Sequence, residues 1–178
     1  AAYERLIGEF PYERLVIAVA DTENTRVSPG FITLNEKDAD DIAFYVAQEY
    51  FGCAVITDPA TDPFLRTGLS KYVSLLMLSE KEFSTALTKQ LLPSISITVP
   101  GGLTPDSRLI RFSSEKEFET VVTLRGAAVL HEMRNSFGAQ TFENALKIYY
   151  QNGKNGNTAY AIGSGYTPRP GDIIFVGY

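Results

Sequence analysis

The sequence predicts an α+β fold, because strand-like segments come first along the chain and helical segments follow. An apolar, β-branched run at residues 15–20 is typical of a buried strand, and a second run at 31–34 is placed to lie beside it. We expect a single domain over residues 1–178. It would have a strand-rich part at 1–36, a helical part at 37–153, and a loop and strand-like tail at 154–178.

Composition limits the classes of function. A chain of 178 residues can form one domain with a real core, and 44% hydrophobic with 21% charged residues is an ordinary globular balance. The net charge is −5 with acids and bases interspersed, which gives no basis for holding nucleic acid. The apolar runs are too short to insert this segment into a membrane. Cys53 is the only cysteine, so no internal disulfide can form and the compartment stays unknown.

The first half of the chain predicts two helices around the strands. A short one begins near residue 2 and ends before Pro11, and the polar stretch 21–29 is typical of a turn-rich loop. A longer helix is expected over 38–51, with three acids at the positive end of its dipole: Asp38, Asp40 and Asp41. Its body is apolar nearly all round, which predicts a central, buried helix.

The second half predicts mainly helices. The sequence Thr61-Asp62-Pro63 is a good helix start, and that helix should run to about residue 92. Residues 94–99 alternate like a strand and precede a Pro-Gly-Gly turn.

Capping signals mark the last two helices. Ser114 with Glu117 predicts a capping box ahead of a long helix that Gly138 closes. Thr141 opens a shorter helix that ends near Gly153. The apolar run at 173–176 then predicts a terminal strand-like tail.

Several short segments between residues 3 and 150 carry a family resemblance. They are GEFPY at 8–12, GFITL at 30–34, EYFG at 49–52, LRTGLSKY at 65–72 and RGAAVLH at 125–131. In this order and at these spacings they resemble "FGPYPY", "GLITY", "QWFG", "LNEGLAEY" and "KGALVLH" of the M1 family of zinc aminopeptidases, the gluzincins. The resemblance implies a thermolysin-like catalytic-domain fold.

The residues for the family's chemistry are absent from the matching positions. Such an enzyme needs two histidines one helical turn apart, a neighbouring glutamate as general base, and a third ligand from a facing helix. The resemblance places the histidines at Phe44 and Gln48 and the general base at Tyr45. The third ligand would be a glutamate 18 intervening residues further on, where Thr67 stands.

Two more positions of the family site are also replaced. Val27 stands where the resemblance places the glutamate that holds the substrate's amino group, and Thr123 stands where it places the oxyanion-stabilising tyrosine. We therefore expect a vestigial site at six positions and a domain that binds no zinc or other cofactor. The resemblance implies a catalytically inactive pseudopeptidase, a binding or scaffold module in a larger protein with an unknown protein or peptide partner.

An alternative function stays open, namely a hydrolase or peptidase that uses other residues. His131 is the only histidine and is expected to pack or lie at the surface, while Cys53 at the end of a buried helix is expected to be a small apolar filler. A nucleophile would need a base. We also expect Phe44 to fill the space that metal and water occupy in an active relative.

Overall fold

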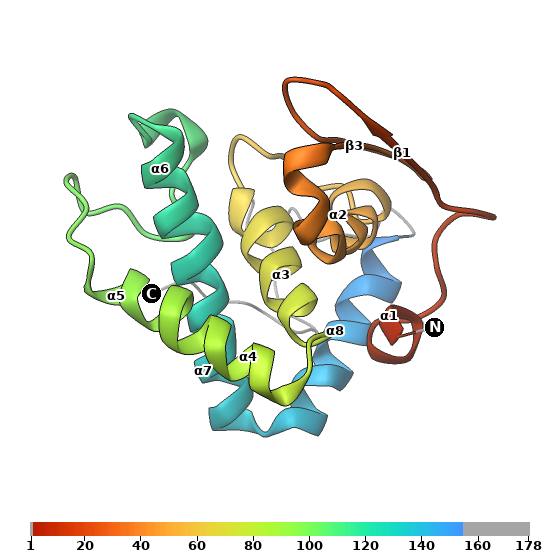
Figure 1. Ribbon diagram of the computed structural model, residues 1–178. Helices are drawn as coiled ribbons and strands as arrows, with labels where there is room; N and C mark the ends of the chain where they lie inside the picture. Colours follow the sequence, from red (N-terminus) through yellow and green to blue (C-terminus); the bar gives the residue numbers. More distant parts are fainter. Residues whose placement is uncertain (1, 155–178) are drawn as a thin grey trace, which may run out of the picture.

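The computed structural model describes residues 2–154, so the tail after Lys154 lies outside the described residues. The predicted α+β fold is confirmed: a small sheet comes first and helices follow (Figure 1). Strands β1 (Val16–Ala20) and β3 (Phe31–Asn35) pair in parallel, which confirms that the two runs lie side by side. Buried Ile32 and Leu34 of β3 anchor the sheet on the helical part.

A short edge strand lies where the sequence predicted only a loop. β2 (Arg26–Ser28) pairs antiparallel with β3, with Val27 opposite Ile32, so the sheet order is β1-β3-β2. Arg26 and Ser28 are exposed and only Val27 is half-buried. The strand therefore has no apolar alternation, and its pairing with β3 alone defines it. Gly30, with φ of 70°, makes the turn between β2 and β3.

The helices follow one another through residue 153. α1 spans Ala2–Leu6, α2 Ile42–Gln48, α3 Pro63–Leu75, α4 Glu80–Ala86, α5 Leu92–Ser96, α6 Glu115–Phe118, α7 Gly126–Phe137 and α8 Ala139–Gly153. Three π-helical segments extend them without a break: η2 (Glu49–Ala54) after α2, η3 (Leu87–Leu91) between α4 and α5, and η5 (Glu119–Arg125) between α6 and α7. Two 3-10 turns, η1 (Glu36–Asp41) and η4 (Leu109–Arg111), complete the set. Within residues 2–154, no helix has both the length and the apolar character to cross a membrane.

The helix expected from residue 61 to 92 is interrupted. α3 ends at Leu75, and α4 starts at Glu80 behind a full capping box. The Ser79 side chain accepts from the Glu82 backbone N–H, and the Glu82 carboxylate accepts from the Ser79 N–H at 3.1 Å. This Ser-x-x-Glu pattern is visible in the sequence and was the missed signal for a new helix start.

The strand expected at residues 94–99 is wrong. The segment begins as α5, with Pro93 in its first turn, and continues as irregular chain after Ser96. The Arg125 guanidinium donates to the carbonyl oxygens of Ser94 at 3.0 Å and Ile97 at 2.7 Å. Because η5 supplies this long-range cap, the carbonyls at the end of α5 need no strand partner.

Two other helix starts differ in detail from the prediction. The Ser114 side chain accepts from the Glu117 N–H as expected, but the Glu117 carboxylate accepts from Ser113 instead of closing the box on Ser114. Gly138, with φ of 86°, ends α7, and α8 begins at once instead of at Thr141.

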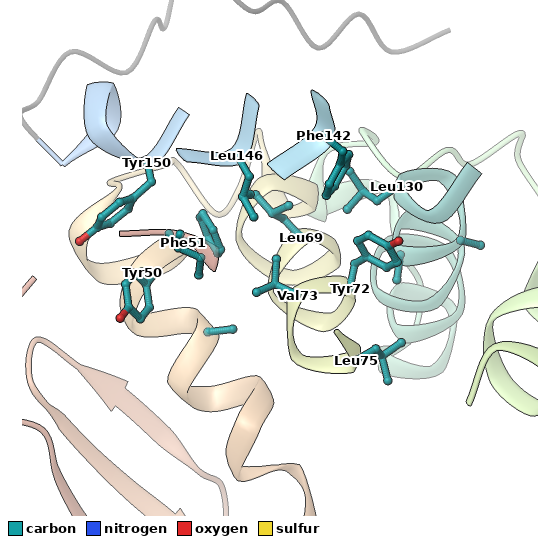
Figure 2. Close-up of a cluster of buried hydrophobic side chains, with 14 of the residues drawn as sticks. Tyr50, Phe51, Leu69, Tyr72, Val73, Leu75, Leu130, Phe142, Leu146 and Tyr150 are labelled. Carbon is teal, nitrogen blue, oxygen red and sulfur yellow. The ribbon is translucent and has the colours of Figure 1, made fainter. Parts of the chain in front are cut away.

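The central buried helix is α3, and not the helix over 38–51 that the sequence favoured. α3 packs against α2 on one side and against η5 and α7 on the other. A Cβ on Gly68 would stand 2.7 Å from the Val122 carbonyl oxygen and 2.8 Å from the Phe64 ring. The close approach of α3 to η5 therefore requires a glycine at this position. The core around α3 is rich in aromatic and branched side chains, of which Figure 2 labels Tyr50, Phe51, Leu69, Tyr72, Val73, Leu75, Leu130, Phe142, Leu146 and Tyr150.

Candidate functional site

The candidate site lies where the first half of α2 meets α3. α2 carries Phe44, Tyr45 and Gln48, which are all half-buried, and α3 carries Thr67 on the neighbouring helix. α3 also packs against η5, which carries Thr123. The fold therefore brings together the three helical segments that the resemblance assigns to the site.

Phe44 does not fill this region as expected. Its ring is partly exposed and lies outside the buried hydrophobic cluster. It meets the Tyr45 ring edge-on, with centroids 5.2 Å apart, and the Lys71 Nζ stands 5.9 Å from its centroid. An ammonium group must keep water or charged partners, so a face that contains one cannot close into an apolar core.

Lys71 is the main site residue that the sequence analysis missed. It lies on α3 one turn after Thr67, and its side chain is only 14% exposed. Its Nζ lies 3.4 Å from an Asp41 carboxylate oxygen, at the start of α2. Burial raises the pKa of the Glu119 carboxyl on η5, while the Thr123 hydroxyl and, to a smaller extent, the Lys71 ammonium favour its ionised form. The chain's own cation therefore lies between an aromatic ring and two acids.

The acids before α2 do more than complement the helix dipole. Asp38 accepts a 2.6 Å hydrogen bond from the Thr25 hydroxyl, and that hydroxyl accepts from the Asn35 N–H. This connects the loop before β2 to η1 at the edge of the site. Burial, with a smaller contribution from the Asp38 carboxylate, raises the pKa of Tyr45 to about 12, so its phenol stays protonated at neutral pH.

Glu49 fixes the turn that follows strand β2. Its side chain is fully buried, and its Oε2 accepts a 3.0 Å hydrogen bond from the N–H of Gly30, in the β2–β3 turn. Its Oε1 has no hydrogen-bond partner within the described part of the chain. Desolvation raises the pKa of this carboxyl.

Val27 and Thr123 lie at two edges of the region. The strand that carries Val27 packs against η2, whereas α2 itself packs against β3. Thr123 is 1% exposed, and its hydroxyl favours the ionised form of the neighbouring Glu119 carboxyl on the same segment. Neither side chain has a carboxylate or a phenol.

The remaining nucleophile and base candidates have other surroundings. The His131 Nδ1 lies 3.2 Å from the hydroxyl oxygen of buried Tyr72, its ring packs on Phe83 with centroids 5.5 Å apart, and burial lowers its pKa. The role in packing that the sequence favoured thus agrees with these contacts. Burial, reinforced by the Glu49 charge, raises the pKa of Cys53 to about 11, which keeps the thiol protonated.

The donor set at the site does not suit zinc. Zinc in proteins takes imidazole, thiolate or carboxylate ligands, and Phe44, Gln48 and Thr67 provide none of these. In the described part of the chain, no group of three or more His, Cys, Asp or Glu side chains could hold a metal ion. Lys71 adds a positive charge to the same region, which further disfavours a dication.

Comparison with known proteins places the fold. No family profile and no curated protein matches this chain. Among solved structures, an M1 zinc metallopeptidase from Deinococcus radiodurans matches with a TM-score of 0.70 and 21% identity over 91% of this chain and 37% of its own. A mutant of an M1 zinc metallopeptidase from the same organism, bound to a Tyr-Ser-Ala substrate, matches with a TM-score of 0.70 and 22% identity, covering 85% of this chain and 35% of that one.

These matches define a class by fold. The chain has an M1 metallopeptidase-like fold, as the sequence motifs predicted. It spans only about a third of the length of the solved structures that it matches.

Proposed function

We propose that this chain is a catalytically inactive, metallopeptidase-like domain that serves as a binding or scaffold module within a larger protein. The observation that carries the proposal is the position of Lys71. The ammonium of half-buried Lys71 lies 5.9 Å from the Phe44 ring centroid and 3.4 Å from an Asp41 oxygen, in the region where the resemblance puts two zinc ligands and a general base. The Lys71 cation disfavours a dication in the same region, and Phe44, Gln48 and Thr67 offer none of the usual zinc donors.

The groups for the family reaction are also missing around this centre. Peptide hydrolysis by such a site requires a polarising dication, a base for the water and a donor for the oxyanion. Tyr45 carries a protonated phenol where the resemblance places the base, and Thr123 offers a buried hydroxyl where it places the oxyanion-stabilising tyrosine. Val27 cannot hold an amino group. Neighbouring residues could replace one missing catalytic group more easily than all of them together.

No specific observation favours the alternative of a hydrolase that uses other residues. The Cys53 thiol is kept protonated by its raised pKa, and the hydrogen-bonding and ring contacts of His131 are with Tyr72, Asn135 and Phe83. A nucleophile and a base must lie within hydrogen-bond reach of each other.

A short peptide is the class of ligand that best suits the region. One structural neighbour holds a Tyr-Ser-Ala substrate. In this chain, β2 is an edge strand with exposed Arg26 and Ser28, and extended peptides can add to such an edge through backbone hydrogen bonds. Glu49 fixes this edge through Gly30, so the strand is held ready to pair.

The first experiment measures the zinc content and the aminopeptidase activity of the purified protein. We expect no zinc above trace levels after purification without chelator, and no turnover of amino-acid anilides with or without added zinc or cobalt. About one zinc per chain, or turnover that follows this polypeptide through repurification, would overturn the proposal.

A second experiment tests the assigned positions by restoring zinc ligands at them. The triple variant Phe44→His, Gln48→His and Thr67→Glu puts two imidazoles and a carboxylate at the assigned positions, and we expect it to bind zinc measurably by competition with a chromogenic chelator. Adding Lys71→Met should tighten that binding because it removes the competing cation. The matched control puts two histidines at Thr85 and Lys89, exposed on α4 and η3 with the same spacing, and should bind far more weakly. If the triple variant binds no better than this control, the assigned positions are wrong.

A further inference from the structure

An apolar groove lies on the surface that α5 and α7 share. It has a volume of about 420 Å³, and its walls are Ile95, Arg125, Ala128, Val129, Glu132, Met133, Ser136 and Phe137. Three of its apolar side chains are well exposed: Ile95 at 51%, Val129 at 43% and Phe137 at 63%. Leu92 and Ile97 extend the exposed apolar surface along the α5 side. Exposed apolar side chains gathered around a groove make it a candidate contact surface.

The charges beside the groove have a symmetric arrangement along α7. Arg125, Val129 and Glu132 follow one another at helical spacing and share one face of the helix. The cation lies one turn before Val129 and the anion lies one turn after it. Arg125 uses part of its guanidinium on the carbonyls of α5, which fixes its position. No ion pair of Glu132 is found within residues 2–154.

We propose that this groove is the contact surface of a homodimer, in which the α7 helices of two copies pack antiparallel about a two-fold axis close to Val129. A two-fold contact requires a surface that is complementary to itself. An apolar centre with a positive group four residues before Val129 and a negative group three residues after it meets that requirement about an axis between Ala128 and Val129. The two-fold axis puts Arg125 of each copy beside Glu132 of the other and brings the two Val129 side chains together.

The exposed ends of the two helices also match in this arrangement. Antiparallel packing about Val129 places Phe137, eight residues beyond the axis, opposite the middle of η5 in the other copy. Since α5 packs against η5, Phe137 comes near the exposed apolar side chains of α5 in the other copy, among them Ile95. A strongly basic or strongly acidic partner suits the groove less well, since each sign of charge would meet a like charge there.

Site-directed cross-linking tests the axis directly. In a Cys53→Ser background, Val129→Cys places two thiols at the axis, and mild oxidation should give a disulfide-linked dimer in high yield. Ile148→Cys, on α8 with a similar exposure of 41%, is the matched control and should stay monomeric. Equal cross-linking of both variants would show random collisions and would overturn the proposal.

Sedimentation equilibrium of the unmodified chain gives the affinity. We expect a reversible dimer in the micromolar range of concentration. Glu132→Arg places two cations together at each end of the contact and should weaken association roughly tenfold or more, whereas Asn152→Arg on exposed α8 should not. Circular dichroism checks that both variants fold. A monomer at high micromolar concentration, with no cross-link at Val129, would mean that the groove is covered by something other than a second copy.

Discussion

The two halves of the helical segment at residues 42–54 lie in opposite environments. In the first half, Phe44 and Tyr45 are partly exposed, and their neighbours include the charged groups of Lys71, Asp41 and Asp38. In the second half, aromatic residues are enclosed. Tyr50 is 1% exposed and packs against Tyr3, Phe10 and Tyr150, and Phe51 is 0% exposed and stacks on Tyr149.

This contrast shows that an aromatic residue on an apolar helix is not by itself a core residue. The second half receives aromatic partners from α1 and α8, whereas the first half receives a lysine from α3. Burial is decided by what the neighbouring elements present. The candidate site thus keeps an open, charged character while the other end of the same helix holds the domain together.

The largest expected effect is at the enclosed end. Phe51→Ala removes a fully buried ring and should lower the free energy of unfolding by about 3–5 kcal/mol, as large-to-small core changes do. Chemical denaturation followed by far-UV circular dichroism measures it. A loss below about 1 kcal/mol would mean that this end is not the main core.

The next largest effect tests the close approach of α3 to η5. Gly68→Ala puts a methyl group 2.7 Å from the Val122 carbonyl oxygen, so backbone must shift, at an expected cost of about 1–3 kcal/mol. Gly52→Ala is the control, because its new methyl group would meet only the flexible Arg66 side chain. Equal destabilisation of the two variants would contradict the proposed packing.

Phe44→Ala tests the open end. Because the ring is half-buried, we expect a loss of only about 1–2 kcal/mol, well below that of Phe51→Ala. Part of this loss of unfolding free energy should come from the contact between the Phe44 ring and Lys71. A double-mutant cycle with Lys71→Met should give a coupling of about 0.5–1 kcal/mol from the contact between cation and ring. A loss as large as that of Phe51→Ala would restore the idea of a filled cleft.

The last prediction concerns the buried acid between the two halves. The pKa of Glu49 is raised in the folded state because burial disfavours the carboxylate, so its contribution is most favourable below the unfolded pKa and is lost as pH rises through the folded pKa. Glu49→Gln should therefore stabilise the domain at pH 8, and the difference should shrink towards pH 4. Only a modest change is expected at pH 4, where the carboxyl is protonated, since the protonated acid and the amide have the same shape. Urea midpoints of both proteins across this range measure it. A difference that grows as pH falls would contradict the argument.

Local signals in the sequence predicted much of the fold. The runs at 15–20 and 31–34 became paired strands, because β-branched residues favour extended backbone. The expectation of a buried strand at 15–20 was wrong, since no residue of β1 is fully buried and Val19 is 59% exposed at this edge of the sheet. Pro63, Ser114 and Gly138 marked helix ends correctly, since capping depends on atoms within a few residues. The capping box at Ser79 was equally local and could have been found. The interruption at 76–79 was therefore predictable.

Long-range contacts explain the errors. The stretch 94–99 alternates like a strand, but Arg125 caps it as the end of a helix from about thirty residues away. β2 has no apolar pattern, and only its pairing with β3 defines it. No local pattern contains either contact.

The sequence alone determined which chemical groups stand at the six assigned positions, and therefore that Phe44, Gln48 and Thr67 offer no usual zinc donor. The tertiary structure decided what surrounds them. Lys71 is an ordinary polar residue of α3 in the sequence, and it becomes a half-buried cation beside Phe44 because α3 packs against α2 and η5. Donor chemistry belongs to each side chain by itself, whereas burial and charge pairing exist only between segments that folding brings together.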